Sequence, residues 1–177
     1  MPVWLIEPDI ECIKEAVKPY LEAMGCQSND FAVEYLTQGS WHKIYTITAY
    51  NSNIQELTDY IFRVALPVDP YYKMESEVAT TELVRHSTTI PVPIIFAYDS
   101  STQNKLGLEW MLMEKVAGTR LTEAWSTLSD SSKSFLTKRV ADWVKQMSSI
   151  VGDKIGGIYM QYTETQAEFY IGRCVIQ

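Results

Sequence analysis

Residues 31–67 read FAVEYLTQGSWHKIYTITAYNSNIQELTDYIFRVALP, and this stretch decides the fold. Three segments within it are rich in Val, Ile, Tyr, Phe and Thr, the residue types that favour strands. These segments are Phe31–Gln38, His42–Tyr50 and Leu57–Ala65. Short turns rich in Gly, Ser and Asn separate them, and Pro67 follows the third. The stretch therefore predicts an antiparallel meander of three strands.

The segments on both sides extend this meander to an α+β domain. Apolar residues at helical spacing predict one helix over Pro8–Met24 and another over Tyr71–Arg85. Two more strands are predicted over Pro93–Tyr98 and Leu108–Val116. The expected fold is a five-stranded antiparallel sheet with one packed helix, followed by helices. We expect an N-terminal helical extension over 1–30, the sheet domain over 31–118 and further helices over 119–177.

Composition and charge exclude several classes of function. The chain has 177 residues, and 15 Lys and Arg against 22 Asp and Glu give a net charge of −7. Such a surface repels phosphate backbones and anionic lipids, so we expect neither nucleic acid nor a membrane as partner. Three cysteines and two histidines fall at no metal-ligand spacing, so no metal site is predicted. An acidic N-terminus without signal-peptide features leads us to expect a cytosolic location.

Four features fall in the order that a kinase-like nucleotide-binding lobe requires. They are a Gly39-Ser40 hairpin turn, Arg63 in an apolar strand, Glu77 on the next helix, and the strand exit at 114–116. In such a lobe a loop covers the phosphates, a strand cation contacts them, and a helix glutamate holds that cation. Taken singly, each feature has an ordinary explanation as a turn, a solvated charge or a strand end. Their order favours the nucleotide-binding interpretation.

Six segments also resemble aminoglycoside phosphotransferase-like proteins, the fungal branch above all. The likeness runs from about Phe31 to the end of the chain. The segments are YIFRVALP at 60–67, KMESEVAT at 73–80, TIPVP at 89–93, WMLMEKVAG at 110–118, IGGIY at 155–159 and YIGR at 170–173.

This resemblance implies a kinase-like N-terminal lobe over 31–118 and the first helices of a second lobe over 119–177. Relatives of this kind transfer a phosphoryl group from ATP to a small-molecule hydroxyl. Arg63 stands where the family has a third-strand lysine, and it keeps the charge but presents a planar fork. The implied nucleotide-binding residues are Gly39 and Ser40 in the loop, Arg63 with Glu77 as its ion-pair partner, and Glu114, Lys115 and Val116 at the adenine edge.

The catalytic part of the family pattern is missing from these residues. No His-x-Asp followed by Asn occurs, and neither Asp-x-Asp nor Asp-Phe-Gly is present. Those aspartates accept the hydroxyl proton and hold the Mg²⁺ of phosphoryl transfer. We therefore predict no catalytic residue and no Mg²⁺ site in this chain. The expected protein is a truncated phosphotransferase with weak ATP binding and no phosphotransfer. It is a naturally shortened gene product, an artificially shortened chain, or a decayed gene fragment without a selected role.

The alternative prediction is a non-catalytic interaction module. Apolar residues recur on one face of a helix that Ser129 or Asp130 caps, and they are Leu136, Val140, Trp143, Val144 and Met147. If that face is exposed, it attracts a partner or a second copy of the chain.

Overall fold

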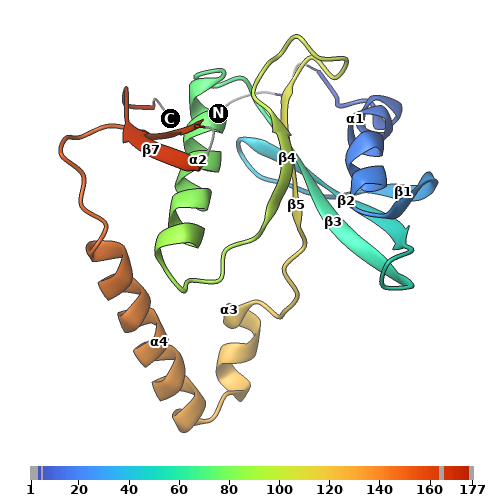
Figure 1. Cartoon of the computed structure of the whole chain (residues 1–177). Coiled ribbons are helices and arrows are strands. Elements are labelled where there is room, and N and C mark those ends of the chain that lie inside the picture. Colours follow the sequence, from blue (N-terminus) through green and yellow to red (C-terminus); the bar gives the residue numbers. More distant parts are fainter. Residues whose placement is uncertain (1–3, 5, 164–165, 176–177) are drawn as a thin grey trace. The chain divides into compact units, whose positions relative to one another are not determined.

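Five strands form one antiparallel sheet in the order β1-β2-β3-β5-β4 (Figure 1). The computed structural model describes residues 4, 6–163 and 166–175. The strands are β1 (Cys26–Gln38), β2 (His42–Asn51), β3 (Glu56–Ala65), β4 (Ile95–Asp99) and β5 (Glu109–Glu114). The predicted α+β class and the five-stranded antiparallel sheet are confirmed.

The chain divides into two compact units. The first comprises Met1–Val78, Pro93–Lys115 and Val175–Gln177, and the second comprises Ala79–Val92 and Val116–Cys174. This division differs from the expected regions of 1–30, 31–118 and 119–177. The first difference arises because the N-terminal helix belongs to the core of the sheet. The second difference arises because the helix that follows β3 is divided between the units, and its residues from Ala79 onward belong to the second unit.

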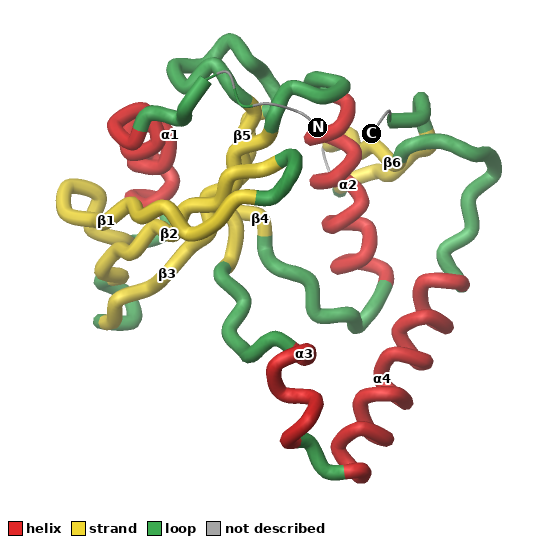
Figure 2. Tube along the Cα trace, turned by 180° about the vertical axis from the view of Figure 1, so that it is seen from behind, coloured by secondary structure: helices red, strands yellow, loops and turns green. Residues whose placement is uncertain are grey.

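Helix α1 (Ile10–Ala23) covers one face of the sheet (Figures 1 and 2). Asp9 caps it, because its carboxylate accepts hydrogen bonds from the amides of the first turn. Three side chains at helical spacing, Ile13, Val17 and Leu21, have no exposed surface. They pack with strand residues such as Phe62, which belongs to the same buried cluster. The helix that the sequence predicts is thus a structural part of the sheet domain.

Strand β1 is longer than predicted, beginning at Cys26 rather than Phe31. Cys26 is buried and pairs with Asn51 of β2, whereas Phe31 pairs with Ala49. Between these two pairs, β1 advances by five residues while β2 advances by only two. The polar residues 27–30 are accommodated as an irregularity of the pairing, which explains why alternation does not reveal this part of the strand.

Helix α2 (Tyr72–Ser87) begins in the first unit and ends in the second. The second unit also contains α3 (Leu121–Ala124), a 3₁₀ turn (Trp125–Thr127) and α4 (Asp130–Ser148), which Ser129 caps. These helices match the prediction for 119–177.

The sequence predicts helices after the sheet and does not reveal the hairpin that β6 (Ile158–Tyr162) and β7 (Ala167–Ile171) form beyond them (Figure 2). Tyr159 and Tyr170 are opposite each other and stack with ring centroids 5.8 Å apart. Gly156 is required beside this hairpin, since a β-carbon there would lie 2.0 Å from the carbonyl oxygen of Gly172.

Candidate nucleotide-binding site

Arg63 projects from the face of the sheet opposite α1. Successive side chains of a strand point to opposite faces. Phe62 and Val64 are fully buried on the α1 side, so Arg63 lies on the other side. There it is next to Met111 of β5, whose sulfur lies 3.9 Å from its Nη2. The guanidinium side chain keeps 20% of its surface exposed, so a ligand can reach it from solvent.

Glu77 of α2 binds this guanidinium, as the sequence predicts. Arg63 Nη2 donates a hydrogen bond to Glu77 Oε2, and the two groups form an ion pair. A charge-assisted hydrogen bond of this kind fixes the orientation of the planar guanidinium. The pairing of Arg63 with Glu77 is therefore confirmed. Their role in binding a nucleotide stays a prediction.

Two further carboxylates hold the beginning of α2 against the sheet. Glu75 accepts hydrogen bonds from the hydroxyls of Tyr98, at 3.2 Å, and Ser100, at 2.6 Å. Glu109 of β5 accepts a hydrogen bond from the amide of Tyr71, just before the helix. Tyr71 has a φ of 70°, a left-handed conformation that non-glycine residues seldom adopt. These contacts fix the position from which Glu77 reaches Arg63.

The Gly39-Ser40 turn connects β1 to β2. It lies next to the C-terminal end of β3, the end near Arg63. The Gly39 amide donates to the His42 carbonyl at 2.9 Å, and the Leu66 amide donates to the Trp41 carbonyl at 2.9 Å. Both Gly39 and Ser40 are exposed. A β-carbon at Gly39 would meet nothing within 4 Å, so packing does not require glycine there.

His42 lies beside this turn, on the same face of the sheet as Arg63. It pairs with Ala65, which in turn pairs with Glu109, so the three residues form one row across β2, β3 and β5. Its Nε2 is buried and has no hydrogen-bond partner among the residues that the structure describes. Burial, followed by the charges of Arg63 and Lys73, lowers the pKa of His42 from 6.5 to about 4. The imidazole is therefore neutral at neutral pH.

This lowered pKa predicts how stability depends on pH. The unfolded chain binds the His42 proton more readily than the folded protein does. The free energy of unfolding should therefore fall as pH drops from about 6.5 to about 4, and this contribution should not change below that window. His42→Gln should flatten the dependence, which urea unfolding at both ends of the window measures. A His42 imidazole that titrates near 6.5 by NMR would contradict the prediction.

The predicted adenine edge is occupied by contacts within the sheet. The Glu114 amide donates to the Ile94 carbonyl at 2.8 Å, and the Ile94 amide donates to Glu114 Oε2 at 3.1 Å. Lys115 Nζ lies 2.7 Å from Asp59 Oδ2. Val116 belongs to the second unit and is 65% exposed. Within the first unit, the side chains of Glu114 and Lys115 therefore do not meet Arg63, and the Glu114 amide is already used. The adenine-binding role of residues 114–116 stays a prediction.

Sequence reasoning missed three residues that belong to the site, His42, Lys73 and Glu109. Lys73 is only 8% exposed and Glu109 only 1%. Burial raises the pKa of the Glu109 carboxyl, while the Tyr71 amide and Lys73 oppose that rise. Lys73 precedes Glu77 by four residues, the spacing that places two side chains on one helix face. This four-residue spacing from Glu77 is the sequence feature that could have identified Lys73 as part of the site.

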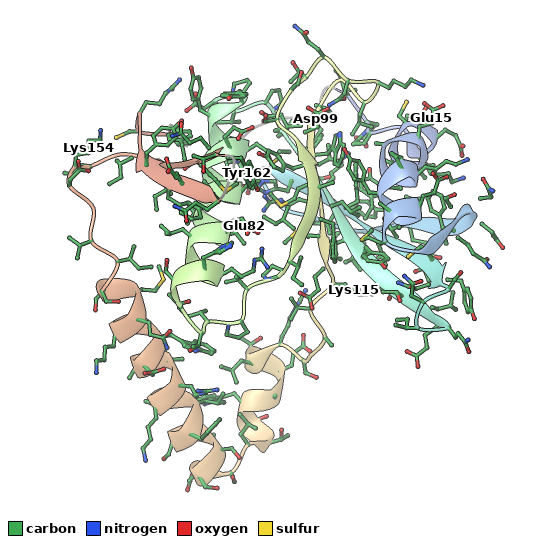
Figure 3. The ribbon with its side chains drawn as sticks, viewed as in Figure 1. Glu15, Glu82, Asp99, Lys115, Lys154 and Tyr162 are labelled. Carbon is green, nitrogen blue, oxygen red and sulfur yellow. The ribbon has the colours of Figure 1, made fainter. Side chains whose placement is uncertain are left out.

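A separate cavity of about 240 Å³ lies between α1 and the loop that joins β4 to β5. Glu15 and Asp99 contribute to its lining (Figure 3). Lys105 also lines it, and its Nζ forms an ion pair with Glu15 at 2.6 Å. Acidic groups outnumber basic ones in this lining, so the cavity does not suit a phosphate.

Within residues 4, 6–163 and 166–175, no group of three or more His, Cys, Asp or Glu side chains is arranged to hold a metal ion. Across the same residues, no helix has the length and apolar character needed to span a bilayer.

Comparison with known proteins gives relatives of low identity, and no family model matches the chain. The chain is 28% identical over 126 residues to a subtelomeric hrmA-associated cluster protein of Aspergillus fumigatus, covering 70% of this chain and 24% of that protein. It is 28% identical over 131 residues to the mitochondrial "altered inheritance of mitochondria protein 9" of Meyerozyma guilliermondii, covering 72% and 21%. The Candida tropicalis protein of that name is 24% identical over 138 residues, covering 72% and 22%.

These comparisons bear on two expectations. The chain spans between a fifth and a quarter of the length of these curated relatives. None of the three names describes a phosphotransferase, so the resemblance to that family stays a prediction. The expected cytosolic location is wrong, because the names of the yeast relatives place those proteins in mitochondria. The acidic N-terminus on which that expectation was based is no guide to location here.

Proposed function

We propose that the first unit is a nucleotide-binding lobe of the aminoglycoside phosphotransferase-like kind, which binds the phosphates of ATP weakly. The observation that carries this proposal is the Arg63–Glu77 ion pair. It joins the third strand to the helix that follows it, on a sheet ordered β1-β2-β3-β5-β4. A loop with Gly39 and Ser40 adjoins the same strand end. A cation fixed by a helix glutamate beside such a loop is the arrangement that kinase-like lobes use for nucleotide phosphates.

The chemistry of the guanidinium supports this function. Arginine presents five N–H donors in a rigid fork that matches phosphate oxygens. Nη2 is engaged by Glu77, whereas Nε is buried without a hydrogen-bond partner among the described residues. On the sheet face that carries Arg63, the next row of side chains consists of Thr46, Ile61 and Met113. Ile61 and Met113 are half-buried, and they offer an apolar surface on which an adenine ring can lie.

The test is a calorimetric titration of the 177-residue chain with ATP at millimolar concentration, together with an assay of phosphotransfer. We expect measurable binding heat, because Arg63 and the loop are accessible. We expect no phosphotransfer from Mg-ATP to a panel of amino alcohols, because these residues lack a catalytic His-x-Asp and a metal-binding Asp. The absence of binding heat would contradict the nucleotide-binding proposal. Turnover in a preparation free of other kinases would contradict the predicted lack of catalysis.

The location proposed for this protein is mitochondrial, on the strength of the relatives named for mitochondrial inheritance. Subcellular fractionation tests it, with co-sedimentation of the protein and mitochondrial markers as the expected outcome.

A second candidate function is an interaction module built on α4. No residue of this helix is buried. Val140, Val144 and Met147 are 50%, 63% and 43% exposed, and they recur on one face. Such a patch favours self-association. Sedimentation of the chain at high concentration should then show a dimer that Val144→Glu disperses. A strict monomer at every concentration would contradict self-association without affecting the nucleotide-binding proposal.

A further inference from the structure

A buried ammonium group lies beside the Gly39-Ser40 turn. Lys73 is in the first turn of α2, and only 8% of its surface is exposed. Its Nζ lies 5.6 Å from the centroid of the ring of Trp41, the residue that directly follows Ser40. A cation above an aromatic ring is attracted by the ring's negative face. The loop and the lysine are therefore in direct contact.

Lys73 and Arg63 both lie near the His42 imidazole, beside the Gly39-Ser40 turn. The charges of both residues lower the pKa of His42, so both are close to that imidazole. His42 is on the sheet face that carries Arg63 and immediately follows Trp41. Lys73 also precedes Glu77, the partner of Arg63, by one turn of α2. Two cations from different elements thus converge on the end of the loop.

Only one of these two cations has a counter-charge in contact. Glu77 pairs with Arg63, whereas Lys73 forms no ion pair within the described part of the chain. Lys73 lowers the pKa of the buried Glu109 carboxyl, yet Glu109 Oε1 accepts its hydrogen bond from the Tyr71 amide. A buried ammonium group that has no direct ion pair is only partly compensated by a nearby acid. An anion that reaches Lys73 is correspondingly stabilised.

We propose that Lys73 is a phosphate-binding residue of this site, and that a nucleotide polyphosphate bridges Lys73 and Arg63 beside the Gly39-Ser40 turn. This inference rests on the nucleotide-binding function proposed above. It also accounts for the arginine at the third-strand position, where the resemblance leads us to expect a lysine. The ammonium group comes instead from the helix, and the guanidinium provides the second contact.

The experiment compares ATP and adenosine binding by calorimetry in wild-type protein and in three variants. Lys73→Met should weaken ATP binding about tenfold or more, because a charge-assisted hydrogen bond to phosphate is lost. Its affinity for adenosine should be unchanged, since adenosine has no phosphate. Lys73→Arg keeps a positive charge and should remain within about threefold of wild type for ATP. Lys105→Met is the matched control, because Lys105 is exposed and pairs with Glu15.

Thermal unfolding of each variant separates binding from folding. Lys73→Met should stay folded but unfold at a somewhat lower temperature than wild type, because it removes a cation that stabilises the Glu109 carboxylate and contacts the Trp41 ring. If it does not fold, Lys73→Gln provides the same comparison with a polar end group. ATP affinity equal to wild type in Lys73→Met or Lys73→Gln would overturn the role of Lys73 and leave the proposed function standing. No ATP binding by the wild-type protein would overturn both.

Discussion

Replacing Arg63 with methionine should weaken ATP binding by about tenfold to a hundredfold. The guanidinium is the one cation of the described site that is both fixed by an ion pair and partly exposed. A hydrogen bond to a charged group contributes about 1.5–3 kcal/mol, and each 1.4 kcal/mol changes affinity tenfold. Calorimetric titration with ATP measures the loss. Adenosine binding should change little, because Arg63 contacts only the phosphates in the proposed site.

Two controls make this prediction specific. Arg63→Met leaves the Glu77 carboxylate without its partner, so the double variant Arg63→Met/Glu77→Gln removes that charge and should bind ATP equally weakly. Arg120→Met removes an arginine whose side chain is 80% exposed and should leave ATP affinity unchanged. Wild-type ATP affinity in both Arg63 variants would show that the guanidinium does not bind the phosphates.

Truncating Phe62 to alanine should lower the free energy of unfolding by about 3–5 kcal/mol. Phe62 is fully buried beneath α1 and stacks on Trp110 with ring centroids 5.2 Å apart. Its removal leaves a cavity in the middle of the sheet, and cavities of this size produce losses of about that magnitude. Because small proteins unfold with only about 5–15 kcal/mol, the variant should be close to its folding limit. Urea unfolding followed by far-UV circular dichroism measures the change.

Phe135→Ala is the matched comparison for this substitution. Phe135 lies on α4 and is 60% exposed, so its truncation should change the free energy of unfolding by no more than about 0.5 kcal/mol. Equal losses for the two variants would show that the α1-covered face of the sheet is not the core.

Much of the first unit could be predicted because its sequence pattern reflects burial directly. Residues on β2 and β3 that alternate toward α1, such as Ile47, Phe62 and Val64, are buried, and that alternation identifies the strands. Arg63 interrupts the otherwise apolar run Tyr60–Ala65 within β3. That exception identified the site, and Glu77 could be paired with it from the order of the elements.

The remaining features depend on contacts that the local sequence does not encode. The β6–β7 hairpin consists of two five-residue strands whose pairing involves Tyr159 and Tyr170, too short for periodicity to reveal. Lys73 could not be recognised as buried, because lysines on helices are usually exposed. The hydrogen bond from the Glu114 amide to the Ile94 carbonyl likewise depends on the path of the chain before β4, which the residues at 114–116 do not indicate.

The most direct test of the central claim is a two-dimensional NMR titration of the 177-residue chain with ATP. The claim is that the sheet face bearing Arg63, and not the α1 side, binds the nucleotide phosphates. We predict that ATP shifts the amide resonances of Gly39, Ser40 and Arg63, whereas adenosine leaves those of the Gly39-Ser40 turn in place. Shifts confined to the cavity that Lys105 lines, or no shifts at millimolar ATP, would contradict the account.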